Sequence, residues 1–156
     1  MRLPAKTLCV TRGADLMTVP VLMLVGFAAW TVILLLATVG VYRWSRILIG
    51  HAPIRSFRAD QVEGADWYKR AMRAHANCVE NLPVFGAIVF GLYVGNVASP
   101  LVNALAVAVL LARIMQSLAH VCFDQTNTVT AVRFGFFFVQ IASFLGLTGI
   151  LLTRLS

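Results

Sequence analysis

The chain has 156 residues, of which 60% are hydrophobic and 12% are charged, with a formal net charge of +7 and a mean hydropathy of +0.84. Soluble globular domains usually have roughly 45–50% apolar and about 25% charged residues, so this composition excludes that class. It is typical of an all-α integral membrane protein, in which each helix needs about 20 apolar residues to cross a hydrocarbon core of about 30 Å.

Four apolar runs follow one another along the chain. The predicted membrane spans are residues 18–43, 68–97, 100–123 and 129–153. They fit a single four-helix transmembrane domain over residues 17–156 with short connections, as in a small bundle. Residues 1–16 are predicted to be an N-terminal tail. Two alternatives remain open for this tail: it is native, or Met17 is the true start of the protein.

The loop Tyr42–Asp66 joins the first two spans and is rich in arginine. Seven basic residues cluster in and after this loop: Arg43, Arg46, Arg55, Arg58, Lys69, Arg70 and Arg73. Basic residues near helix ends mark the cytoplasmic side, so we expect the loop to be cytoplasmic, facing inward from the inner membrane if the protein is bacterial. Because the positive charge gathers beside the spans, it indicates a lipid bilayer partner and argues against nucleic acid.

The second and third spans are polar at one end. At 100° per residue, one face of the second span within about a 100° arc carries Arg70, Arg73, Asn77, Glu80 and Asn81. A similar face of the third span carries Arg113, Gln116, Ser117, His120 and Asp124. The chain order puts both polar ends on the same side of the membrane, so we expect two facing polar stripes.

A charge in hydrocarbon costs at least about 2.5–3.5 kcal/mol on insertion scales, so charged residues in the spans should face the bundle and pair. The sequence predicts an ion pair between Glu80 and Arg113. Two interpretations of the stripes stay open. The polar residues hold the helices together, or they bind a small ligand that has carboxylates and peptide groups.

No metal site is expected. The three cysteines, Cys9, Cys78 and Cys122, have no motif spacing. The histidines of the spans, His75 and His120, lie on different segments, and nothing beside them has the spacing of metal ligands.

The stretch RAMRAHANCVENLPVF resembles the signature of the MAPEG family, the membrane-associated proteins in eicosanoid and glutathione metabolism. The family has Arg, Asn and Glu at the spacing R-x3-N-x2-E before a proline, and these correspond to Arg73, Asn77, Glu80 and Pro83. The similarity extends over nearly the whole chain from Met17, including the polar residues of the third span.

This resemblance implies a left-handed four-helix bundle that assembles as a homotrimer and binds glutathione as co-substrate in a cleft between subunits. It further implies transfer of the glutathione thiolate to lipophilic electrophiles, or reduction of hydroperoxides. The implied glutathione-binding residues are Arg73, Asn77, Glu80, Arg113, Gln116 and His120, with Arg43 or Arg46 reaching a carboxylate.

One departure from the family concerns the catalytic position. Family enzymes usually have an arginine near the start of the fourth helix that stabilises the thiolate, and this chain has Thr130 there. Arg133 follows about one turn later, and either replaces the missing arginine as the catalytic residue or is an inward-facing structural charge. His120 also stands where the family typically has tyrosine.

Three functions are therefore compatible with the sequence. The first is a glutathione-dependent transferase or peroxidase acting on hydrophobic small molecules. The second is a non-catalytic membrane protein that binds a lipid or a thiol. The third is a small membrane scaffold. The residues Arg73, Asn77 and Glu80 favour the first over the third, whereas Thr130 keeps the second open.

Overall fold

A computed structural model describes residues 18–57 and 62–155 of the chain. The predictions about the tail, residues 1–16, and about a start at Met17 fall outside these residues, as does Arg58 of the basic cluster. Within the described ranges the chain is helical, with turns between the helices and no strand.

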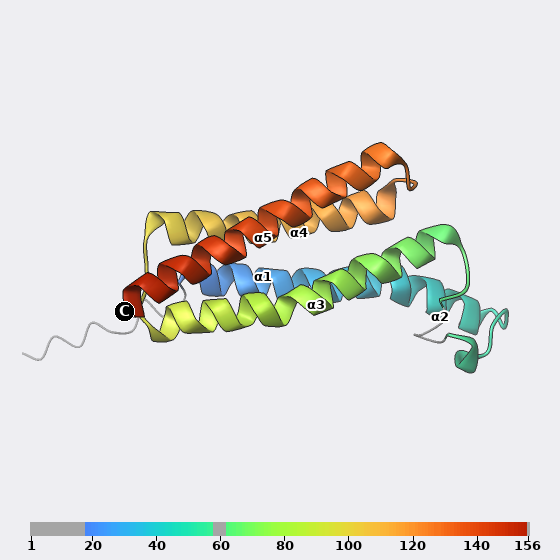
Figure 1. Cartoon of the computed structure of the whole chain (residues 1–156). Helices are drawn as coiled ribbons and strands as arrows, with labels where there is room; N and C mark the ends of the chain where they lie inside the picture. The colour runs from blue at the N-terminus through green and yellow to red at the C-terminus, as the bar shows by residue number, and fades with distance from the viewer. Residues whose placement is uncertain (1–17, 58–61, 156) are drawn as a thin grey trace, which may run out of the picture.

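The described residues form seven helical elements. The first three of them join into one continuous helix, and this helix and the three long helices that follow are each long and apolar enough to cross a membrane (Figure 1). In chain order the seven elements are α1 (Val19–Leu34), η1 (Leu35–Gly40), α2 (Val41–Leu48), η2 (Ile54–Ser56), α3 (Asp66–Val94), α4 (Pro100–Cys122) and α5 (Asn127–Leu155). The predicted all-α membrane fold class is confirmed.

The first membrane helix is longer than predicted, because α1, η1 and α2 form one continuous helix that ends at Leu48 rather than at residue 43. Its middle part, η1, is π-helical. Here the Thr38 hydroxyl donates to the Leu34 carbonyl at 2.6 Å, a contact that competes with the backbone amide and often bends helices. The helix ends before Gly50, whose φ of +73° is readily adopted only without a side chain.

The connection between α3 and α4 is short, as predicted for a small bundle. Asn96 adopts a φ of +50° just after α3, a conformation that asparagine tolerates better than most residues. Ser99 then caps α4: its hydroxyl accepts from the Val102 amide at 3.2 Å, and Pro100 occupies the first turn, where no amide is needed. The two helices therefore run antiparallel.

α4 packs most extensively against α5, and α1, α3 and α4 all pack against one another (Figure 1). Three rings from three helices form the centre. Phe85 of α3 is fully buried between Phe27 of α1 and Phe144 of α5, with ring centroids 5.9 and 6.0 Å away. At one end of the bundle lie α2, the start of α3, the end of α4 and the start of α5.

Truncating the central ring should therefore test the packing. We expect Phe85→Ala to lower the free energy of unfolding by about 3 kcal/mol, because the cavity loses the dispersion contacts of the ring. Titration with a denaturing detergent, followed by circular dichroism, measures this change. Phe138→Ala is the matched control, since that ring is largely exposed. An equal loss of stability in both variants would contradict the central position of Phe85.

Candidate functional site

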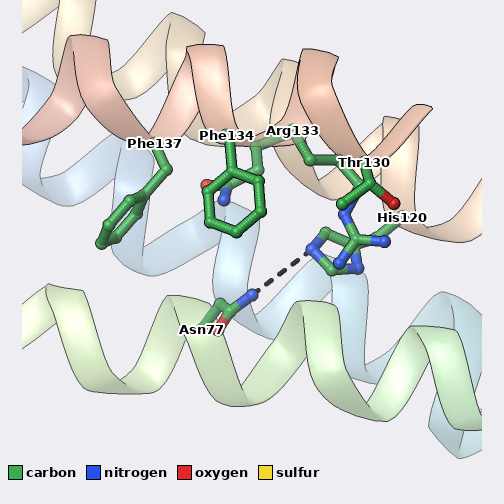
Figure 2. Close-up of a pocket in the computed structure, with 7 residues that line it drawn as sticks. Asn77, His120, Thr130, Arg133, Phe134 and Phe137 are labelled. Carbon is green, nitrogen blue, oxygen red and sulfur yellow. Dashed lines mark hydrogen bonds between the residues drawn. The ribbon is translucent and has the colours of Figure 1, made fainter. Parts of the chain in front are cut away.

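A pocket of about 200 Å³ lies between α3, α4 and α5, toward the end of the bundle where α4 ends and α5 begins (Figure 2). It is lined by Asn77, Gln116, His120, Thr130, Arg133, Phe134 and Phe137. Four of the residues that the sequence singled out for ligand binding or catalysis thus meet in one place, and they come from three helices.

The predicted α3 and α4 stripes meet at this pocket through Asn77 on one side and Gln116 and His120 on the other. The Asn77 amide Nδ2 lies 3.4 Å from Nε2 of His120, which is almost fully buried. An amide nitrogen can only donate, so this contact is a hydrogen bond when Nε2 is unprotonated. Within the described chain the buried Nδ1 of His120 has no hydrogen-bond partner.

A second contact joins the stripes at the same end of the bundle. Arg70 in the first turns of α3 pairs with Asp124 in the loop after α4, with 2.9 Å between nitrogen and oxygen. The Arg70 side chain is mostly buried, whereas the carboxylate is open to solvent. This ion pair ties the start of α3 to the connection between α4 and α5.

A buried hydrogen bond between two glutamine side chains holds the α4 side of the pocket in place. Gln140 of α5 is 0% exposed, and its Nε2 donates to Oε1 of Gln116 at 2.9 Å. This bond leaves both Nε2 hydrogens of Gln116, and the second lone pair of its oxygen, without a partner among the described residues. The sequence analysis missed Gln140, although it is the only amide side chain between Phe134 and Thr153.

Arg133 brings a cation into the pocket from the second turn of α5. Thr130 lies beside it on the same helix face, and Figure 2 shows the Arg133 side chain next to the His120 ring. Its buried Nε has no hydrogen-bond partner among the residues that the structure describes. Arg133 and His120 thus line the polar end of the pocket, and Phe134 and Phe137 form its apolar side.

Arg113 does not lie where the sequence predicted. It is 1% exposed, inside the bundle, with its guanidinium 5.5 Å from the centre of the Phe27 ring. Glu80 is exposed, and no ion pair within 4.0 Å joins the two in the described part of the chain, so the predicted Glu80–Arg113 pair is wrong. The reason is the rotation of α4, which turns Arg113 toward α1.

The other predicted ligand-binding residues lie outside the pocket lining. Arg73 and Glu80 are exposed on the surface of α3. Arg43 donates to the Tyr68 hydroxyl at 2.8 Å and so braces the start of α3 against α2. The Arg46 guanidinium lies 5.4 Å from the centre of a tyrosine ring one turn earlier on the same helix.

The described residues include no group of three or more histidine, cysteine, aspartate or glutamate side chains that could hold a metal ion. The pocket instead offers amide, imidazole and guanidinium donors. This donor set is suited to an anionic or peptide-like ligand.

Comparison with known proteins adds one finding. The model of the MAPEG family matches residues 20–153, which is most of the chain and includes every residue of the pocket. Among curated proteins and among solved structures there is no match. The family includes glutathione transferases and peroxidases. The matched range covers all four membrane helices and the polar stripes between them, so the chain belongs to the MAPEG family.

Proposed function

We propose that the protein is a membrane-bound, glutathione-dependent transferase or peroxidase that acts on lipophilic electrophiles. One observation carries this proposal: Arg133 lies in the same pocket as Asn77, Gln116 and His120, with an apolar wall beside it. Arg133 thus supplies the cation that family enzymes usually have at the position of Thr130.

The chemistry follows from these side chains. A cation next to the thiol of glutathione favours the thiolate, which is the reactive nucleophile. The thiolate sulfur forms a bond with the electrophilic atom, and the leaving group departs with the bonding electron pair. Phe134 and Phe137 provide the surface along which an apolar substrate reaches the sulfur from the bilayer. The Gln116 amide and the His120 ring line the pocket and are the polar groups for carboxylate or peptide oxygens of glutathione.

The exposed charges of α3 support an assembly with the site in a cleft between subunits, and membership of the MAPEG family favours a homotrimer. Arg73 and Glu80 lie within a membrane-spanning helix, yet both are exposed in a single chain. A charge facing lipid near the centre of a bilayer costs at least about 2.5–3.5 kcal/mol. A second copy that covers this face removes the cost and adds both residues to the glutathione pocket.

The same reasoning supports the orientation of the protein. The pocket lies at the bundle end that carries the basic cluster between the first two membrane helices. Basic residues mark the cytoplasmic side, where glutathione is dissolved. We propose that this end of the bundle and the loop Tyr42–Asp66 face the cytoplasm.

The second candidate function is a non-catalytic protein that binds a lipid or a thiol. Thr130 favours it, because family enzymes usually have an arginine at that position. In this case the pocket binds its ligand, but Arg133 does not ionise the thiol.

Calorimetry of glutathione binding to the detergent-solubilised protein separates these functions. The ultraviolet absorbance of the thiolate is followed on the same samples. Binding with thiolate near neutral pH supports the enzyme, whereas binding without thiolate supports the second candidate. No binding at millimolar glutathione contradicts the proposed enzyme.

The hydrogen bond between Gln140 and Gln116 predicts a further effect on glutathione binding. We expect Gln140→Leu to weaken glutathione binding roughly tenfold, because the Gln116 side chain is no longer held in position by its hydrogen bond. The net value of such a bond, about 1–1.5 kcal/mol, corresponds to about a tenfold change in affinity. Gln125→Leu, in the exposed loop after α4, is the matched control. Calorimetry on both variants measures the change, and unchanged affinity in Gln140→Leu would contradict a positioning role for this residue.

A further inference from the structure

Residues 41–57, here called the juxtamembrane segment, comprise α2, the following turn and η2. The segment contains three arginines and one histidine, and no aspartate or glutamate. It directly continues the first membrane helix and extends past the bundle (Figure 1). Its charge is therefore uniformly positive at one end of the membrane domain.

Large apolar side chains of this segment are exposed. Those with the greatest exposed fractions are Leu48 at 78%, Ile54 at 72%, Ile49 at 61% and Trp44 at 60%. Exposed apolar side chains are ordinary in the hydrocarbon core, but here they stand next to exposed arginines. Tryptophan with basic neighbours is the composition of residues that lie at the membrane–water interface.

The length of the helix places the segment at that interface. The continuous helix Val19–Leu48 has 30 residues, and at about 1.5 Å per residue it is about 45 Å long, whereas the hydrocarbon core is about 30 Å thick. If the N-terminal end lies at the opposite boundary of the core, the last turns of the helix lie at the depth of the lipid headgroups. The turn and η2 follow at that level.

The arginines of the segment differ in what they contact. Arg43 is held by the Tyr68 hydroxyl and lies 5.6 Å from the Phe57 ring centre. Arg46 and Arg55 are exposed, and within the described residues neither forms an ion pair. Arg46 lies over the Tyr42 ring, which leaves its N–H donors unpaired in the described chain, so both guanidinium groups can bind phosphate, for which their paired donors are well suited.

We propose that the juxtamembrane segment is a binding surface for anionic phospholipids of the bilayer that the protein spans. Arg46 and Arg55 contact the headgroup phosphates, and Trp44 and Ile54 insert among the first acyl carbons. The proposal is independent of glutathione chemistry, because these residues lie outside the pocket.

Native mass spectrometry of the protein in neutral detergent tests the proposal. Phosphatidylglycerol or phosphatidylcholine is titrated into the sample, and the affinity of each lipid is measured for the wild type and for variants. Arg55→Gln and the double variant Arg46→Gln, Arg55→Gln remove charge from the segment. Arg154→Gln is the control, because it removes one exposed charge at the opposite end of the bundle.

The expected result is preferential binding of phosphatidylglycerol, weakened about fivefold by Arg55→Gln and about 25-fold by the double variant, since each basic residue near the surface contributes about 1 kcal/mol. Phosphatidylcholine affinity and the Arg154→Gln variant should not change. Equal loss in Arg154→Gln, or unchanged phosphatidylglycerol affinity in the double variant, overturns the proposal. So does a change of oligomeric mass without a change in lipid affinity, which assigns the surface to a second copy.

Discussion

Replacing Arg133 with glutamine is expected to abolish the thiolate absorbance of bound glutathione and to lower kcat/KM by at least about 100-fold. Loss of one donor that stabilises developing charge typically costs 10²–10³ in rate, and Arg133 is the cation that lines this pocket. Glutathione should still bind, because the Gln116 amide and His120 remain in place. The two effects can be separated by measuring binding and turnover on the same preparation.

Two further variants serve as a control and a rescue for the Arg133→Gln result. Arg154→Gln also removes one arginine from α5, but at the exposed far end, so it should leave turnover unchanged. Thr130→Arg combined with Arg133→Gln returns a cation to the pocket one turn earlier, at the position that family enzymes usually use. Recovery of the thiolate in this double variant supports the assigned role. Full thiolate formation in Arg133→Gln alone would show that Arg133 is a structural charge.

Arg113→Met is expected to raise the free energy of unfolding by about 2 kcal/mol, although it removes a buried residue from the centre of the bundle. Replacing a buried charge with an apolar side chain of similar volume is often stabilising by about 1–4 kcal/mol. Arg113 fits this case because its Nε and Nη2 have no hydrogen-bond partner in the described chain and Glu80 does not pair with it. The loss of its cation–π contact with Phe27 offsets part of the gain.

Detergent-induced unfolding followed by circular dichroism measures this stability. Arg113→Lys is the control, since lysine keeps the buried charge and should give no gain. Glutathione binding should persist in Arg113→Met, because Arg113 does not line the pocket. A loss of several kcal/mol in Arg113→Met would mean that the guanidinium makes a stabilising contact after all.

The fold could be predicted from the sequence because the bilayer limits what an apolar chain can do. Backbone groups must be satisfied within each segment, so long apolar runs become helices, and their number follows from run lengths. The residues at which the helices end were predicted less accurately. The helix that continues to Leu48 was missed because the polar residues of α2 look like a loop, whereas the break comes only at Gly50.

The facing stripes of α3 and α4 could also be predicted, since helical periodicity fixes which residues share a face. Asn77 and His120 illustrate this, because both were placed on stripes and the structure brings them within 3.4 Å. Periodicity gives angles only around a helix's own axis, however. The rotation of one helix relative to its neighbours depends on side-chain packing in the assembled bundle.

The sequence by itself therefore determined a four-helix membrane protein with polar stripes at one end and the residues that identify its family. The tertiary structure decided which polar residues meet: it joined Arg133 to Asn77 and His120, and it buried Gln140 against Gln116. It also placed the Arg113 guanidinium over the Phe27 ring, without an ion pair to Glu80 in the described chain. The reason is physical, because these contacts join residues on different helices, and only packing sets the distance between them.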